Sequence, residues 1–312
     1  MKYESEEELN TCMNRTVKFC LKQLDFESGV IEGFEWVLNE ITGNVFDHSG
    51  ENMGWLQTIT YTNNHKLTLT VCDTGIGIPN TIRKTFPNFR KDEQAIEYSL
   101  RKGVTSNKEG QGNGLAGATE IARLSKKSNL SIASGKGRVI IQNGKVEVKR
   151  LFPSFVGTCF DLQLSTEIPI DLEKALGHMP MSYSEYLESD EGYMEFRLRD
   201  HSLSFGNRVT GEKLRNMFLN IRKQNPDKTI RIDMDEIGII SSSFADEFFG
   251  RLFVSLGPIS FGSMIKFKNL NSNCKAIIDD VVSQRLAQNY YKGGGGEPRT
   301  VPGFGRQKTQ QH

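Results

Sequence analysis

The sequence predicts a two-domain α/β protein, and three observations lead to that fold class. The chain has 312 residues, 37% hydrophobic and 25% charged, which is ordinary globular composition and the length of about two domains. Apolar residues alternate in some segments, as in strands, and recur every three or four positions in others, as in helices. After Ile168 and Pro169 this patterning loosens, and it then resumes as a strand-helix alternation.

Composition also limits the class of partner. The net charge is +1, so no global field favours nucleic acid or acidic lipid. The N-terminal residues 1–7 lack an apolar signal core, and no window approaches the length of a membrane span. The cysteines lack metal-type spacing and are expected to be reduced thiols: Cys12, Cys20, Cys72, Cys159 and Cys274. We therefore expect a cytoplasmic protein.

The first half of the chain is expected to form an α/β sandwich. Residues 8–24 have helical periodicity, and residues 54–72 alternate as a hairpin of two strands. Residues 129–165 alternate as further strands, with Gly135, Gly137 and Gly144 expected at turns. Two helical layers would then pack against a mixed sheet.

One polar segment lies where an expected strand ends. Asp73 follows the alternation of Leu67, Leu69 and Val71, and the glycines Gly75 and Gly77 come directly after it. A strand that carries a carboxylate to its end and breaks into glycines lets a ligand approach the backbone closely. A tight turn closing a hairpin explains the same residues equally well.

Two other segments favour a nucleotide site. Glu40 and Asn44 are four residues apart in a helical pattern, so they share one helix face, although a solvated face is the alternative. Glycines precede a second helical pattern at Leu115, and such a loop presents unpaired N–H groups to an anion. The residues of this loop are Gly110, Gly112 and Gly114.

In order and spacing these segments resemble the GHKL ATPases, which include gyrase B, Hsp90 and the catalytic domains of histidine kinases. Residues 39–44 resemble the asparagine box, residues 73–77 and 110–115 the two glycine boxes, and residues 157–160 the late Gly-Thr. The resemblance covers an ATP-binding domain at residues 8–168. It also implies an ATP lid at residues 80–109, where Lys102 or Lys108 would meet phosphate unless both are solvated surface charges.

The resemblance assigns roles to individual residues. It implies ATP and Mg²⁺ as ligands, with Glu40 as general base and Asn44 as metal ligand. Asp73 would accept the adenine amine, with Thr158 nearby. The remaining binding positions would leave room for the ligand and the lid: Gly75, Gly77, Gly110, Gly112, Gly114 and Leu115.

The second half of the chain divides into three parts. Residues 169–192 are expected to be a linker, flexible enough to reach across a small domain. Residues 193–290 alternate between strands and helices and form a small α/β domain. Residues 291–312, with four consecutive glycines and a polar composition, are expected to be disordered.

Residues 230–245 of this domain resemble the STAS fold of anti-sigma-factor antagonists. Ser243 falls on the serine that this family phosphorylates, and Ser242 is its neighbour. Two positions depart from the family pattern, because Ser241 replaces an aspartate and Phe244 replaces a glycine. Helix N-capping explains the serines as well as phosphorylation does.

These features together predict an ATP-binding signalling protein. The first interpretation is an Mg²⁺-dependent ATPase or serine kinase that acts on, or through, its fused STAS-like domain. The alternative is an ATP-gated interaction or dimerisation module without phosphoryl transfer. A protein partner is expected at the STAS-like domain, a homodimer is left open, and neither nucleic acid nor membrane is expected.

Overall fold

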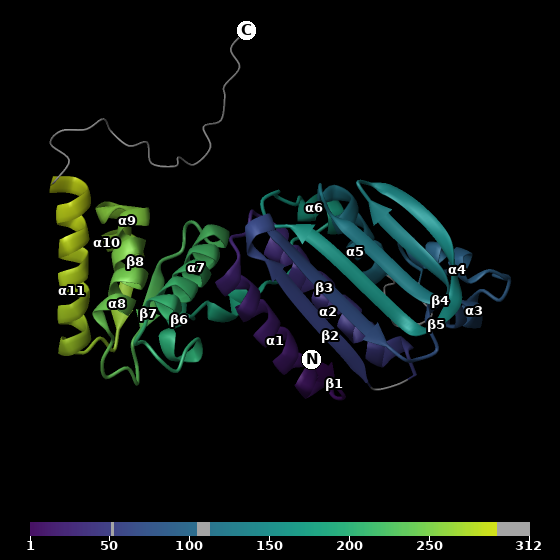
Figure 1. The fold of residues 1–312 in the computed structure, drawn as a ribbon, viewed down its shortest axis with the longest axis horizontal. Coiled ribbons are helices and arrows are strands. Elements are labelled where there is room, and N and C mark those ends of the chain that lie inside the picture. Colours follow the sequence, from purple (N-terminus) through teal and green to yellow (C-terminus); the bar gives the residue numbers. More distant parts are fainter. Residues whose placement is uncertain (51–52, 105–112, 292–312) are drawn as a thin grey trace, which may run out of the picture.

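A computed structural model describes residues 1–50, 53–104 and 113–291 of the chain, and two separate sheets organise them (Figure 1). The first sheet has five strands in the order β1-β2-β3-β5-β4. Its strands are β1 (Lys2–Tyr3), β2 (Gly54–Tyr61), β3 (Lys66–Asp73), β4 (Asn129–Gln142) and β5 (Lys145–Ser165). The second sheet has three parallel strands, β6 (Met194–Arg197), β7 (Ile230–Asp233) and β8 (Ile265–Lys268).

The first sheet is antiparallel at every pairing, so the expectation of a mixed sheet was wrong. Short connections decide two of these pairings. Residues 62–65, with a 3-10 turn at 62–64, join β2 to β3, and two residues join β4 to β5, which leaves no length for a parallel crossover. Helices of this unit are α1 (Glu6–Gln23), α2 (Val30–His48), α3 (Ile78–Thr85), α4 (Asp92–Ser99) and α5 (Gly114–Leu124).

The strand β4 is longer than the sequence predicts, because Gly135 and Gly137 do not form turns. Both lie inside β4, where the pairing with β5 shifts register around them. A Cβ on Gly137 would lie 2.6 Å from the backbone nitrogen of Glu93, so the absence of a side chain lets α4 pack closely on the strand. Gly135 has a φ of +56°, which glycine adopts without strain. Of the three glycines that the sequence predicts at turns, Gly144 alone lies in one.

The segment expected to be a flexible linker is ordered and packed. It contains α6 (Leu172–Leu176), whose Leu172 and Ala175 are buried against the first unit. Further along, the backbone N–H of Tyr183 donates to the Glu35 carboxylate of α2 at 2.6 Å. Residues 169–192 therefore do not form the flexible linker that the sequence predicts.

The second unit has helices between and beside its three strands. They are α7 (Arg208–Gln224), α8 (Ser242–Ala245), a π-helical turn (Asp246–Gly250), α9 (Arg251–Leu256), α10 (Pro258–Met264) and α11 (Ser272–Leu286). The core of this unit is rich in fully buried phenylalanines: Phe196, Phe218, Phe244, Phe248 and Phe249. Their rings pack edge-to-face or stacked at centroid distances of 4.7–6.4 Å.

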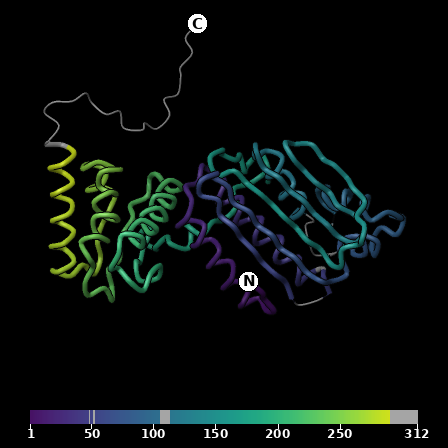
Figure 2. Tube along the Cα trace, viewed as in Figure 1, coloured from purple at the N-terminus to yellow at the C-terminus, as the bar shows by residue number. Residues whose placement is uncertain are grey.

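The two units meet where α1 lies beside α7 (Figure 2). Asn220 of α7 is buried, and its amide nitrogen donates to the carbonyls of Leu21 and Leu24 at 2.9 and 2.7 Å. Its amide oxygen accepts from the backbone N–H of Phe26 at 3.0 Å. Carbonyls at a helix C-terminus have no partner within the helix, so a side chain of the second unit caps the end of α1.

Among the residues that the structure describes, none of the helices combines the length and the apolar character that a bilayer span requires. Residues 292–312, which belong to the predicted tail, are outside the described ranges.

Candidate functional site

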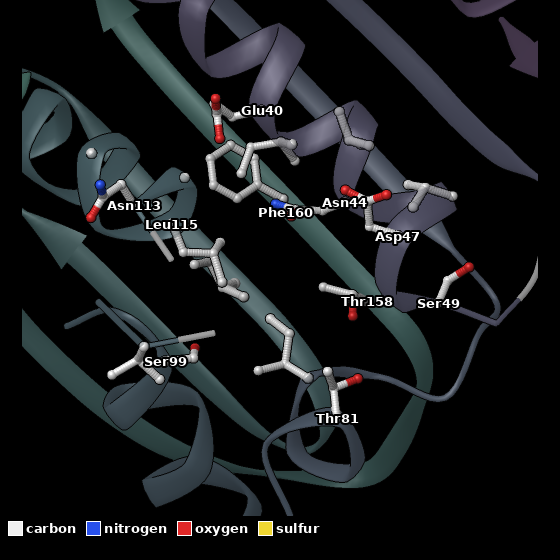
Figure 3. A pocket seen from close by; sticks show the side chains of 18 of the residues that line it. Glu40, Asn44, Asp47, Ser49, Thr81, Ser99, Asn113, Leu115, Thr158 and Phe160 are labelled. Atoms are coloured by element: carbon white, nitrogen blue, oxygen red, sulfur yellow. The ribbon is translucent and has the colours of Figure 1, made fainter. Parts of the chain in front are cut away.

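A cavity of about 580 Å³ opens beside the first sheet, between α2 and the N-terminus of α5 (Figure 3). This volume is typical of a site for a small organic ligand. The end of β3 and an interior part of β5 form its base, and α3, α4 and α6 contribute to its walls. Polar or charged side chains from these elements line it: Glu40, Asn44, Asp47, Ser49, Asp73, Thr81, Ser99, Lys102, Asn113, Thr158 and His178.

Glu40 and Asn44 both line the cavity from α2, as their spacing of four residues predicts. The pKa of the Glu40 carboxyl is raised above its ordinary value, mainly because burial disfavours its charge. The nearby Asp47 carboxylate raises this pKa further, and His178 opposes the effect. A carboxylate of raised pKa in a half-buried site is suited to accept a proton at neutral pH.

Asp73 lies at the base of the cavity as the last residue of β3. The backbone N–H of Gly75 donates to its carboxylate at 2.8 Å, and the backbone N–H of Thr158 donates as well. Burial raises the pKa of Asp73, and these two hydrogen bonds act in the opposite direction. The carboxylate is therefore held in a fixed orientation by the turn after β3 and by the neighbouring strand β5, with acceptor capacity left for a ligand.

The glycines after Asp73 are required by close approaches of the backbone. A Cβ on Gly75 would lie 2.2 Å from the carbonyl oxygen of Ser49, just beyond the end of α2. Gly77 has a φ of +77°, and a Cβ there would lie 2.6 Å from the Ser134 hydroxyl. Gly75 does not line the cavity, whereas Gly77 does. Both glycines thus determine the shape of the turn, but only Gly77 is placed to contact a ligand in the cavity.

The second glycine segment is described only in part. Gly110, Gly112 and Lys108 lie outside the described residues. Gly114 begins α5 and lines the cavity together with Leu115. A Cβ on Gly114 would lie 2.6 Å from a carboxylate oxygen of Glu40, so a larger residue would press on that carboxylate.

Three residues in or beside the cavity were not predicted from the sequence. Asp47 is three residues beyond Asn44 on the same face of α2, and helical spacing alone would have identified it. Ser134 of β4 accepts from the Ile78 N–H at 3.0 Å and donates to the Gly157 carbonyl at 2.7 Å, so it joins the turn after Asp73 to β5. His178 reaches the cavity from the segment after α6, which no local pattern indicates.

Part of the cavity wall comes from α6, in the segment between the two units. Ala175 and Leu176 line the cavity beside Trp36 of α2. A Cβ on Gly117 of α5 would lie 2.2 Å from the Trp36 ring and 2.8 Å from the Leu176 side chain, so the three elements pack without spare space. The site is thus built partly from the chain that leads into the second unit.

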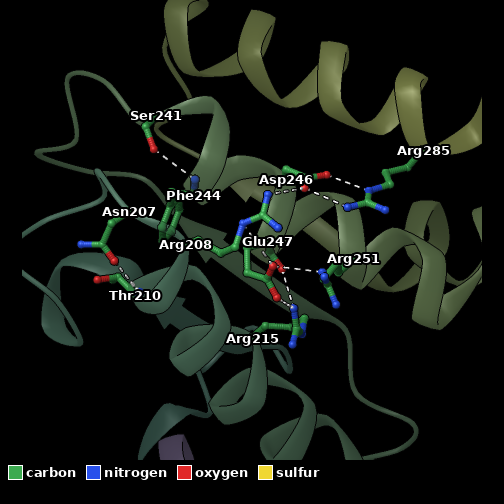
Figure 4. A network of polar contacts seen from close by, with 10 residues as sticks. All are labelled: Asn207, Arg208, Thr210, Arg215, Ser241, Phe244, Asp246, Glu247, Arg251 and Arg285. Atoms are coloured by element: carbon green, nitrogen blue, oxygen red, sulfur yellow. Dashed lines mark hydrogen bonds and ion pairs between the residues drawn. The ribbon is translucent and has the colours of Figure 1, made fainter.

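The serine triplet lies in the second unit at the start of α8 (Figure 4). The Ser241 hydroxyl accepts from the Phe244 N–H at 3.0 Å and caps the helix, while Ser242 and Ser243 are exposed. Phe244 points into the core, so the residue that replaces the family's glycine does not cover the serines.

A network of arginines and carboxylates follows the serines along this helix (Figure 4). Arg285 binds Asp246 through two nitrogens at 2.7 and 2.8 Å, and these bonds lower the pKa of Asp246. Arg208 also reaches Asp246 at 3.4 Å, while Arg215 and Arg251 pair with the buried Glu247. Four guanidinium groups therefore surround two carboxylates.

Comparison with known families agrees with this geometry. Residues 29–167 match the family of histidine kinase-, DNA gyrase B-, and HSP90-like ATPases. Residues 210–275 match a STAS-like domain of unknown function. A comparison with curated proteins found no match to the chain.

The chain therefore joins two domain classes. A GHKL-type ATPase domain comes first, and a small STAS-like α/β domain follows it, which is the fusion that the motifs predicted. The first domain indicates ATP binding and an activity of the ATPase or kinase type.

Proposed function

We propose that the chain binds ATP with Mg²⁺ in the cavity and hydrolyses it, and that the nucleotide state is transmitted to the STAS-like domain. The placement of Glu40, Asn44 and Asp73 around one cavity of suitable volume carries this proposal. Asp73 would accept the adenine amine, because its carboxylate is already oriented by two N–H groups and guanine offers no amine at that position.

The donors around Asn44 fit a magnesium ion. Mg²⁺ prefers oxygen ligands and keeps several waters, so one amide oxygen together with phosphate oxygens suffices. Among the described residues, no group of three His, Cys, Asp or Glu side chains is placed to hold a metal ion by itself, so the phosphate oxygens would supply ligands. When bound, the ion would neutralise phosphate charge. Glu40 would orient the attacking water and accept its proton, while Gly77, Gly114 and Leu115 leave room for the ligand.

The test separates binding from turnover. Glu40→Gln keeps the size of the side chain and removes its basicity, so ATP affinity should persist while hydrolysis falls on the order of 10²–10⁴-fold. Glu7→Gln, the same change at an exposed position of α1, is the matched control and should hydrolyse ATP normally. Wild-type turnover in Glu40→Gln would assign the base to another group.

Transmission to the second domain is supported by the path of the chain. The segment that lines the cavity at Leu176 and His178 continues to Tyr183, which is bonded to Glu35 of α2. The adjoining contact between α1 and α7 is fixed by the buried Asn220. A change in the cavity wall on nucleotide binding would therefore act on packed elements that lead into the STAS-like domain.

A second candidate function is phosphoryl transfer to Ser243 or Ser242. Both hydroxyls are exposed at a helix N-terminus, where added negative charge is stabilised, and Arg208 binds Asp246 one helical turn away. In Figure 1, however, α7 lies between α8 and α1 of the ATPase domain, and it contacts both helices. This arrangement favours transfer between two chains over transfer within one.

Phosphopeptide mapping after incubation with Mg-ATP distinguishes the two candidates. Phosphate on residues 241–243 that disappears in Glu40→Gln would support the transfer reaction. ATP hydrolysis without any phosphate on these residues would support the ATP-gated module, whose protein partner or second copy would dock through the STAS-like domain.

A further inference from the structure

Two cysteine thiols face each other across adjacent strands beside the nucleotide site. Cys72 of β3 is paired directly with Cys159 of β5, and their sulfur atoms are 2.8 Å apart. Directly opposed residues of antiparallel strands have Cα atoms about 4.5–5.5 Å apart, which is within the range that a disulfide bridges. Closing the bond would need a movement of the sulfurs of less than 1 Å, to about 2.05 Å.

The pair lies on the face of the sheet opposite the cavity. Side chains alternate along β3, so Val71 and Asp73 face the cavity while Cys72 faces away from it. Both thiols are half-buried, not enclosed, and in Figure 1 this sheet has α2 and α5 behind it. A small reagent can therefore reach the thiols without entering the nucleotide site.

The remaining thiols offer no such pair. Cys12 and Cys20 are buried in α1 and separated by two helical turns, and Cys274 is buried in the second domain. The described residues also contain no group of three His, Cys, Asp or Glu side chains that could complete a metal site around Cys72 and Cys159. This geometry therefore favours a bond between the two sulfur atoms over metal binding.

We propose that Cys72 and Cys159 form a reversible disulfide that fastens β3 to β5 immediately beside Asp73 and Thr158. The oxidant is a small organic disulfide such as oxidised glutathione. The Cys159 thiolate attacks one sulfur of that disulfide and expels one thiolate, giving a mixed disulfide. Cys72 then loses its proton to solvent and attacks the Cys159 sulfur, which expels the second thiolate. Two protein thiols are oxidised, and one small disulfide is reduced to two thiols.

The hydrogen bond between the thiols determines the order of attack. Cys72 donates to Cys159, which lowers the pKa of Cys159, and Arg138 acts in the same direction. Burial and the Asp161 carboxylate oppose this effect. Cys159 is therefore the first nucleophile, and Cys72 resolves the mixed disulfide.

The experiment treats the full-length chain with oxidised glutathione, blocks free thiols by alkylation and maps the peptides. The expected product has lost about 2 Da and carries a Cys72–Cys159 link that dithiothreitol reverses. Because the link joins positions 87 residues apart, Tm should rise by on the order of 5 °C. Free thiols at both positions after treatment, or a link between other cysteines, would overturn the proposal.

Single variants test the assigned roles. Cys72→Ser should stop at the mixed disulfide on Cys159, whereas Cys159→Ser should form little adduct at Cys72. Cys12→Ser, a change at a buried thiol of α1, is the control and should still give the link. A Cys72–Cys159 link that lowers Tm would show that the bond distorts the native strands, which contradicts the fit inferred here.

Discussion

Replacing Asn220 by alanine tests how the two domains are held together. This one side chain makes three hydrogen bonds to the end of α1 and the residues after it, and it is 3% exposed. Alanine removes all three bonds. It leaves the carbonyls of Leu21 and Leu24 and the N–H of Phe26 in a buried contact without these partners.

The magnitude follows from the number of bonds. A buried hydrogen bond contributes about 1 kcal/mol net, so the loss of three predicts a decrease of about 3 kcal/mol in the free energy of unfolding. For a chain of 312 residues, each kcal/mol corresponds to about 1.5 °C, which gives a decrease in Tm of about 5 °C. The proposed transmission from the nucleotide site to the STAS-like domain would pass through this same contact.

Thermal unfolding followed by circular dichroism measures the effect. The matched control is Asn225→Ala, since Asn225 directly follows α7 and its amide donates to the carbonyl of Ile221 in that helix at 3.0 Å, within the second domain. This control should lower Tm by about 1–2 °C. A shift in Asn220→Ala no larger than that of the control would refute the assignment of Asn220 as an interdomain cap.

Three further predictions concern the nucleotide site. Asp73→Asn should weaken ATP binding in calorimetry by about 10- to 150-fold, because a charge-assisted hydrogen bond of about 1.5–3 kcal/mol is lost, and GTP binding should change less. The rate of ATP hydrolysis should fall as pH decreases through the raised pKa of Glu40, because only the ionised carboxylate acts as the base. Asp47→Asn removes a like charge beside Glu40, so the fall in rate should occur at lower pH in this variant. Gly77→Ala should weaken nucleotide binding, because the added Cβ would press on the Ser134 hydroxyl. Gly103→Ala is the control, since Gly103 has a similar φ of +76° but open space around it, and it should not weaken binding. Equal effects of the two changes would attribute the loss to the positive φ alone.

The sequence by itself determined the local features of this protein. Alternation placed β3 and its terminal Asp73, and spacing of four residues placed Glu40 and Asn44 on one face of α2. These predictions hold because each depends on the geometry of a single element, whose period is written in consecutive residues.

Only the tertiary structure decided the contacts between elements. A continuous strand with shifts of pairing register replaced the turns expected at Gly135 and Gly137, because α4 packs where their side chains would be. The segment with α6 looked like a linker, yet its apolar residues are buried and His178 reaches the cavity. Asn220 and the Cys72–Cys159 pair acquire their partners from positions 87 or more residues away. The periodicity of a single element cannot predict contacts between residues so far apart in the sequence, because these contacts depend on how whole elements pack.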